Sequence, residues 1–85
     1  MKDETIEKVA QILEEWNPLG DNANTVEDLD GYRVEAIDII SSLGLIYRND
    51  VEKAVSDILE DAFNISLAGD EVTRAAEKIK KVLDL

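Results

Sequence analysis

The sequence predicts an all-α fold, a compact four-helix domain with a long acidic loop between its first two helices. Four segments place apolar residues three or four positions apart, the spacing that gathers side chains on one face of an α-helix. No segment alternates apolar and polar residues as a half-buried strand does. The 85 residues suffice for one small hydrophobic core and are too few for two. We therefore expect a single helical domain over residues 1–85.

The first helix is predicted over residues 4–16. Asp3 suits the N-cap position, where a short polar side chain accepts a hydrogen bond from a backbone N–H group of the first turn. Pro18 disfavours helical geometry at Asn17, so the helix should end at Trp16, which we expect to be a packing residue. The apolar face consists of Ile6, Val9, Ala10, Leu13 and Trp16.

Residues 17–31 have the composition of a loop, because they are rich in Asn, Asp and Gly and contain the only proline. The spacing of Thr25 and Asp28 favours one helical turn over residues 25–29. Unstructured connections this long are uncommon in small domains and are often functional. We therefore treat this loop as a candidate binding segment.

A second helix is predicted from Tyr32 to about Leu43, and Gly44 can end or bend it. Its apolar stripe is wide, which suggests a central position in the fold. The stripe consists of Tyr32, Ala36, Ile37, Ile39, Ile40 and Leu43.

The third and fourth helices are predicted from similar patterns. The third covers residues 51–63, and the spacing of Asn49 and Glu52 suggests a capping box at its start. The fourth begins with Asp70 as its cap and extends to about Leu83. Lysines in its last turns suit the negative end of the helix dipole.

The charge of the chain is strongly acidic and unevenly placed. Nine basic and 20 acidic residues give a net charge of -11, and residues 14–61 contribute -10 of it, with 13 acids against three bases. Such a charge disfavours nucleic acids and anionic membranes as partners and favours a basic protein. Two alternatives stay open: that the acids serve solubility, or that they complement the dipole of the second helix. The tightest acidic grouping is Glu27, Asp28, Asp30, Glu35 and Asp38.

Residue types exclude most catalytic chemistry. The chain has no histidine and no cysteine, so it lacks the partners for Ser-His or Cys-His nucleophiles and for the usual zinc sites. An EF-hand alignment on Gly31 puts Val26 and Ile37 at the first and last ligand positions, leaving only a weak divalent site open. The Asp-Ser-Leu motif of acyl carrier proteins is also absent, because Ser41 precedes Ser42. We expect no enzyme activity, no cofactor and no metal.

The expected location is the cytoplasm. No apolar run approaches the roughly 18 residues of a membrane span, and the N-terminus lacks the pattern of a signal peptide. The absence of cysteine also means that no disulfide framework is present.

Two motifs carry a family resemblance. Trp16-Asn17-Pro18 closes the first predicted helix, and Tyr32-Arg33-Val34-Glu35-Ala36-Ile37-Asp38-Ile39 opens the second. Together they resemble the small bacterial helical proteins of domain-of-unknown-function family 1871. The resemblance implies a helical fold and no particular activity. In size, helicity and charge placement the chain is also similar to bacterial immunity proteins, which neutralise colicins and the toxins of contact-dependent growth inhibition.

The sequence thus leads to a functional hypothesis. It is an immunity or antitoxin-type inhibitor that binds a basic toxin domain, such as a nuclease, through an acidic loop-helix surface. The alternative is a non-catalytic helical adaptor or regulatory subunit that binds another cytoplasmic protein. The predicted partner-binding residues are Glu27, Asp28, Asp30, Tyr32, Glu35, Asp38 and Tyr47.

Overall fold

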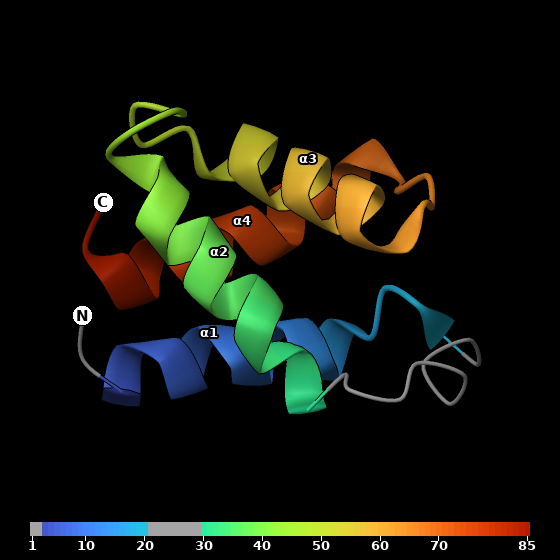
Figure 1. Cartoon of the computed structure of the whole chain (residues 1–85), viewed down its shortest axis with the longest axis horizontal. Coiled ribbons are helices and arrows are strands. Elements are labelled where there is room, and N and C mark those ends of the chain that lie inside the picture. Colours follow the sequence, from blue (N-terminus) through green and yellow to red (C-terminus); the bar gives the residue numbers. More distant parts are fainter. Residues whose placement is uncertain (1–2, 21–29) are drawn as a thin grey trace.

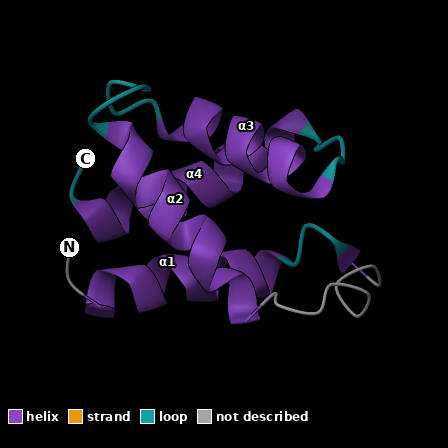
Figure 2. Ribbon diagram, in the orientation of Figure 1, coloured by secondary structure: helices purple, strands orange, loops and turns teal. Residues whose placement is uncertain are grey.

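The computed structural model describes residues 3–20 and 30–85. Within these ranges the chain forms four α-helices and one short 3₁₀ turn, and it contains no β-strand (Figure 2). The all-α, four-helix prediction is therefore confirmed. The elements are α1 (Asp3–Trp16), η2 (Asp30–Tyr32), α2 (Arg33–Leu43), α3 (Val51–Phe63) and α4 (Gly69–Leu83).

The four helices surround one core. Each helix packs against the next along the chain, and α4 returns to pack against α1. Figure 1 shows α1 and α3 on opposite edges, with α2 crossing in front and α4 behind. No helix in the described residues is long and apolar enough to span a membrane. The arrangement leaves the outer faces of α2 and α3 side by side on one surface.

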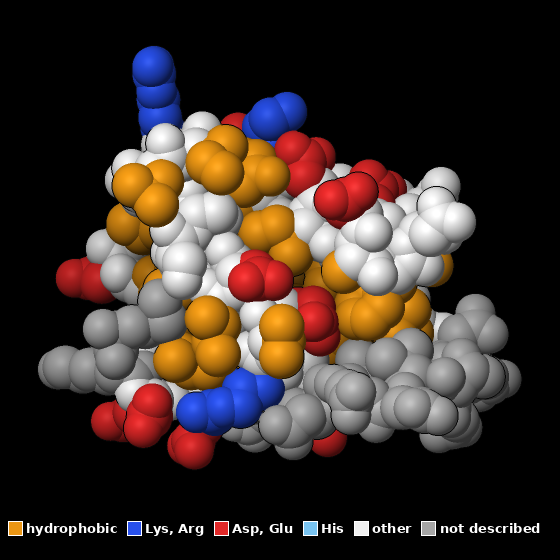
Figure 3. All heavy atoms as spheres, viewed as in Figure 1, with side chains coloured by type: hydrophobic (Ala, Val, Ile, Leu, Met, Phe, Trp, Pro, Cys, Tyr) orange, Lys and Arg blue, Asp and Glu red, His pale blue; other side chains and the backbone are white. Residues whose placement is uncertain are grey.

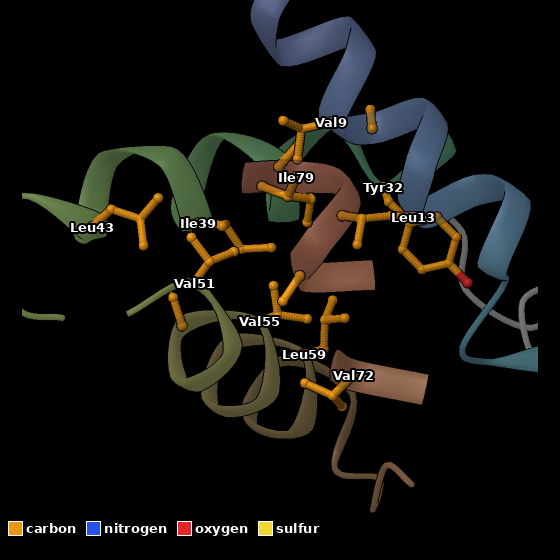
Figure 4. Close-up of a cluster of buried hydrophobic side chains, with 14 of the residues drawn as sticks. Val9, Leu13, Tyr32, Ile39, Leu43, Val51, Val55, Leu59, Val72 and Ile79 are labelled. Atoms are coloured by element: carbon orange, nitrogen blue, oxygen red, sulfur yellow. The ribbon is translucent and has the colours of Figure 1, made fainter. Parts of the chain in front are cut away.

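The core is built from the apolar stripes that the sequence shows. Burying these side chains removes apolar surface from water, which stabilises the fold by about 25 cal/mol for each Å² buried. Trp16 is only half-buried and packs against the edge of the core. Figure 4 shows side chains from all four helices converging in this cluster. The fully buried members include Val9, Leu13, Tyr32, Ile39, Val51, Val55, Leu59 and Ile79.

The N-terminal cap differs from the predicted one in α3 and in α4. Asp50, not Asn49, caps α3, because its side chain accepts a hydrogen bond from the backbone N–H of Lys53 (3.2 Å). The cap position of α4 is Ala68, and Asp70 lies in the first turn, where it pairs with Arg74 (2.8 Å). Several polar residues before each helix could have capped it, and the local sequence does not select among them.

The connection between α1 and α2 was predicted as a loop over residues 17–31. The backbone N–H of Asn17 still bonds to the carbonyl of Leu13 (2.8 Å), and Asn17 then takes a left-handed conformation with φ 51°. At the other end of the connection, η2 already begins at Asp30. The helical turn predicted near residues 25–29 lies outside the described residues.

Candidate protein-binding surface

Three of the seven predicted partner-binding residues belong to the acidic connection. Glu27 and Asp28 lie outside the described residues. Asp30 begins η2, but its side chain is not among those that the structure describes. The acidic loop therefore stays a prediction, and the candidate surface must be sought among the remaining residues.

Tyr32, predicted as a partner-binding anchor, is a core residue, so its ring does not lie on the surface of the described structure. The side chain is only 1% exposed, and its ring meets Phe63 edge to face at a centroid distance of 6.1 Å. Its hydroxyl donates a hydrogen bond to Asn17 Oδ1 (3.0 Å) and accepts one from the N–H of Leu19 (3.4 Å). Burial raises the pKa of this hydroxyl. The buried Tyr32 side chain thus contacts both the segment after α1 and the end of α3.

The backbone explains why α2 begins one residue later than predicted. Gly31 and Tyr32 both have left-handed conformations, with φ of 60° and 63°. This geometry is incompatible with a right-handed helix, so the first residue of α2 is Arg33. A tyrosine in this conformation is strained, and the burial of its ring offsets the cost.

Glu35 is also buried, at 9% exposure, which contradicts its predicted place on the acidic surface. Burial is the main cause that raises the pKa of its carboxyl group; the Asp38 charge adds to the shift, and a hydrogen bond to its own backbone opposes it. The residue lies in the first turn of α2, where a carboxylate also complements the helix dipole. Glu35 is therefore buried in the fold and is not part of the exposed acidic surface.

Replacing Glu35 by Gln should raise the free energy of unfolding at neutral pH. The folded-state pKa is raised, so the fold penalises the ionised carboxylate. The penalty is present in full above the folded-state pKa and disappears below the unfolded-state value. The gain should therefore shrink as the pH falls from about 7 to about 4, measured by urea unfolding at each pH. Glu77→Gln, at an exposed position on α4, is the control. An equal gain in both variants at pH 7 would contradict the prediction.

Asp38 and Tyr47, the two remaining predicted residues, line one groove. It lies between the outer face of α2, the turn over residues 44–50 and the outer face of α3. Asp38 is exposed, and Tyr47 is half-buried against the core. We call this the α2–α3 groove. It is lined by Asp38, Ser41, Ser42, Leu45, Ile46, Tyr47, Ile58, Asp61 and Ala62.

Two of the lining residues are exposed apolar side chains that sequence reasoning did not select. Leu45 is 84% exposed and Ile46 is 71% exposed. The backbone N–H groups of residues 45, 46 and 47 all lie within 3.3 Å of the carbonyl oxygen of Ser42, which holds the turn against the end of α2. The available signal was the Leu45-Ile46 pair directly after Gly44, outside any helical stripe. Such a pair at the surface is typical of a contact site.

The α3 side of the groove is acidic. Asp57 and Asp61 are exposed and one helical turn apart, and both lie beside Tyr47. Burial raises the pKa of the Tyr47 hydroxyl, and the charge of Asp57, a hydrogen bond with the Asp57 side chain and the charge of Asp61 raise it further. Lys53 lies 3.8 Å from Asp57, but both side chains are solvent-exposed, so this pair neutralises the surface only weakly. Figure 3 shows apolar and acidic side chains together over the corner of α2 and α3.

No protein-family model, curated protein or solved structure matches the chain. The resemblance to family 1871 therefore stays a prediction. Within residues 3–20 and 30–85, no group of three or more acidic residues is arranged to hold a metal ion. The candidate site therefore depends on the geometry of the α2–α3 groove alone.

Proposed function

We propose that the protein is a non-catalytic inhibitor of the immunity or antitoxin type, which binds and neutralises a basic toxin domain such as a nuclease. The observation that supports it best is the α2–α3 groove, which is lined by the carboxylates of Asp38 and Asp61 and by the exposed apolar side chains of Leu45 and Ile46. A nuclease active site is basic because it must hold phosphates, so an acidic surface is complementary to it.

The two kinds of residue would contribute to binding in different ways. The carboxylates of Asp38 and Asp61, together with the net charge of -11, attract a cationic partner over a distance and speed its association. Leu45 and Ile46 act only on contact, when their apolar surface leaves the water. Fast association and slow dissociation are both useful to an inhibitor that must act before its toxin does.

The second candidate function is a helical adaptor or regulatory subunit. The exposure of Leu45 and Ile46 favours it, because apolar contacts of this kind need no charged partner. An adaptor complex of this type should persist in high salt, whereas the complex of an acidic inhibitor with a basic toxin should weaken.

The experiment is an isolation of the partner followed by an activity assay. The tagged chain is used to capture its partner from native cells, the complex is dissociated by a salt gradient, and the separated partner is assayed for nuclease activity. We expect activity to return on separation and to be lost again when the purified chain is added back at a one-to-one ratio. A partner that stays active when saturated with the chain would contradict inhibition and favour the adaptor function.

A further inference from the structure

Apolar and acidic residues repeat at helical spacing along the α3 side of the α2–α3 groove, and this spacing indicates what kind of structure fits there. On α3, Ile58 and Ala62 line the groove four residues apart, and Asp57 and Asp61 repeat with the same spacing, Asp61 in the groove and Asp57 next to it. Residues four apart on a helix lie about 5–6 Å from each other. The groove therefore presents an apolar row and an acidic row that run parallel along α3.

The α2 side of the groove contributes one carboxylate, Asp38, beside Ser41 and Ser42. Asp38 projects from α2, and Leu45 and Ile46 extend the apolar floor along the turn. An occupant thus meets apolar side chains of α3 and the turn together with one carboxylate from α2 and one from α3. A helix with an apolar stripe, flanked on both sides by Lys or Arg, has the matching arrangement, because its side chains repeat at the same spacing.

We propose that a cationic amphipathic helix of the partner docks in the α2–α3 groove, an inference that rests on the proposed function and specifies how the partner is bound. Asp38 and Asp61 would pair with basic side chains on the two flanks of that helix. Leu45, Ile46 and the ring edge of Tyr47 would cover its apolar stripe.

Charge argues against a second copy of the chain as the occupant. Two copies related by a two-fold axis would bring the acidic walls of both grooves together, and each copy carries a net charge of -11. The basic end of α4, with Lys78, Lys80 and Lys81, could still enter the groove of another copy. Self-association is therefore one outcome that the experiment must detect.

The probe is a labelled synthetic peptide of about 20 residues, long enough to form a helix on binding. It carries leucines at positions three and four apart, lysines on both flanks and alanines elsewhere. A scrambled peptide of the same composition has equal charge without the stripe. Binding is followed by fluorescence anisotropy, and helix formation is followed by circular dichroism.

The variants separate the groove from the rest of the surface. Leu45→Ser with Ile46→Ser removes the exposed apolar contacts, while Val34→Ser with Leu85→Ser changes two other exposed apolar residues outside the groove. We expect the stripe peptide to bind at least tenfold more weakly to the groove variant and equally well to the control. The scrambled peptide should bind at least tenfold more weakly to the unaltered chain.

Three outcomes would overturn the inference. Equal binding of both peptides would mean that charge alone attracts them, and an equal loss in both double variants would place the contact elsewhere. Self-association of the unaltered chain that the groove variant abolishes, measured by light scattering, would make a second copy the occupant. Because the peptide assay does not use the native partner, a negative result in it would not change the result of the inhibition assay. Conversely, if the peptide binds but the chain does not inhibit its partner, the groove is still a binding site and the adaptor function is favoured.

Discussion

Replacing Tyr32 by alanine should lower the free energy of unfolding by about 3–5 kcal/mol, as for other buried aromatic side chains. The ring is fully buried and packs edge to face on Phe63 at the end of α3, so its removal leaves a cavity in the core. A domain of this size has a total stability of roughly 5–15 kcal/mol. The substitution should therefore lower the melting temperature by about 4–8 °C for each kcal/mol lost, measured by thermal unfolding.

Tyr32→Phe is the matched control for this prediction. It keeps the ring and removes only the hydroxyl that bonds Asn17 and Leu19, so the expected loss is about 1 kcal/mol. Similar losses in both variants would show that the hydroxyl, and not the packing of the ring, supplies the stability. A negligible loss for Tyr32→Ala would contradict the central position of the side chain.

The second large expected effect is on the rate at which the protein associates with the partner captured from native cells. Reversing the charges of Asp38 and Asp61 to lysine should slow association by tenfold or more at low ionic strength, because these carboxylates stand on opposite walls of the groove. The difference should shrink in about 0.15 M salt, where the screening length is about 8 Å. Stopped-flow or surface-based kinetics at several salt concentrations would measure it.

A matched variant separates local from overall charge in this prediction. Glu7→Lys with Glu77→Lys changes the net charge by the same amount at exposed positions on α1 and α4, outside the groove. Its association rate should fall less than that of the Asp38 and Asp61 variant. An equal fall would mean that the overall field, and not the groove, steers the partner.

The binding prediction uses Asp61 where sequence reasoning had relied on Glu35. Reversal of Glu35 would place a lysine at a buried position and would disturb folding as well as binding. Asp38, a predicted partner-binding residue, is exposed because it faces away from the apolar stripe of α2. Glu35 sits three residues earlier on the same helix, where the neighbouring elements cover it. The helical spacing carries part of this information, because Glu35 lies three residues after Tyr32 and four before Ile39, beside the apolar stripe.

The sequence by itself determined the helical fold class and the four helices to within a residue or two. Those features depend on the spacing of apolar residues and on Pro18, both of which can be read from neighbouring residues in the sequence. It also determined that the chain is strongly acidic over residues 14–61.

Only the tertiary structure decided which polar and aromatic residues reach the surface. Tyr32 is buried against Phe63 of α3 and Glu35 is buried on α2, whereas Leu45 and Ile46, in the turn after α2, remain exposed. The groove itself joins residues 38, 47 and 61 from α2, a turn and α3. Exposure and grouping are set by the packing of elements distant in sequence, and a pattern within one segment specifies only the face of its own helix.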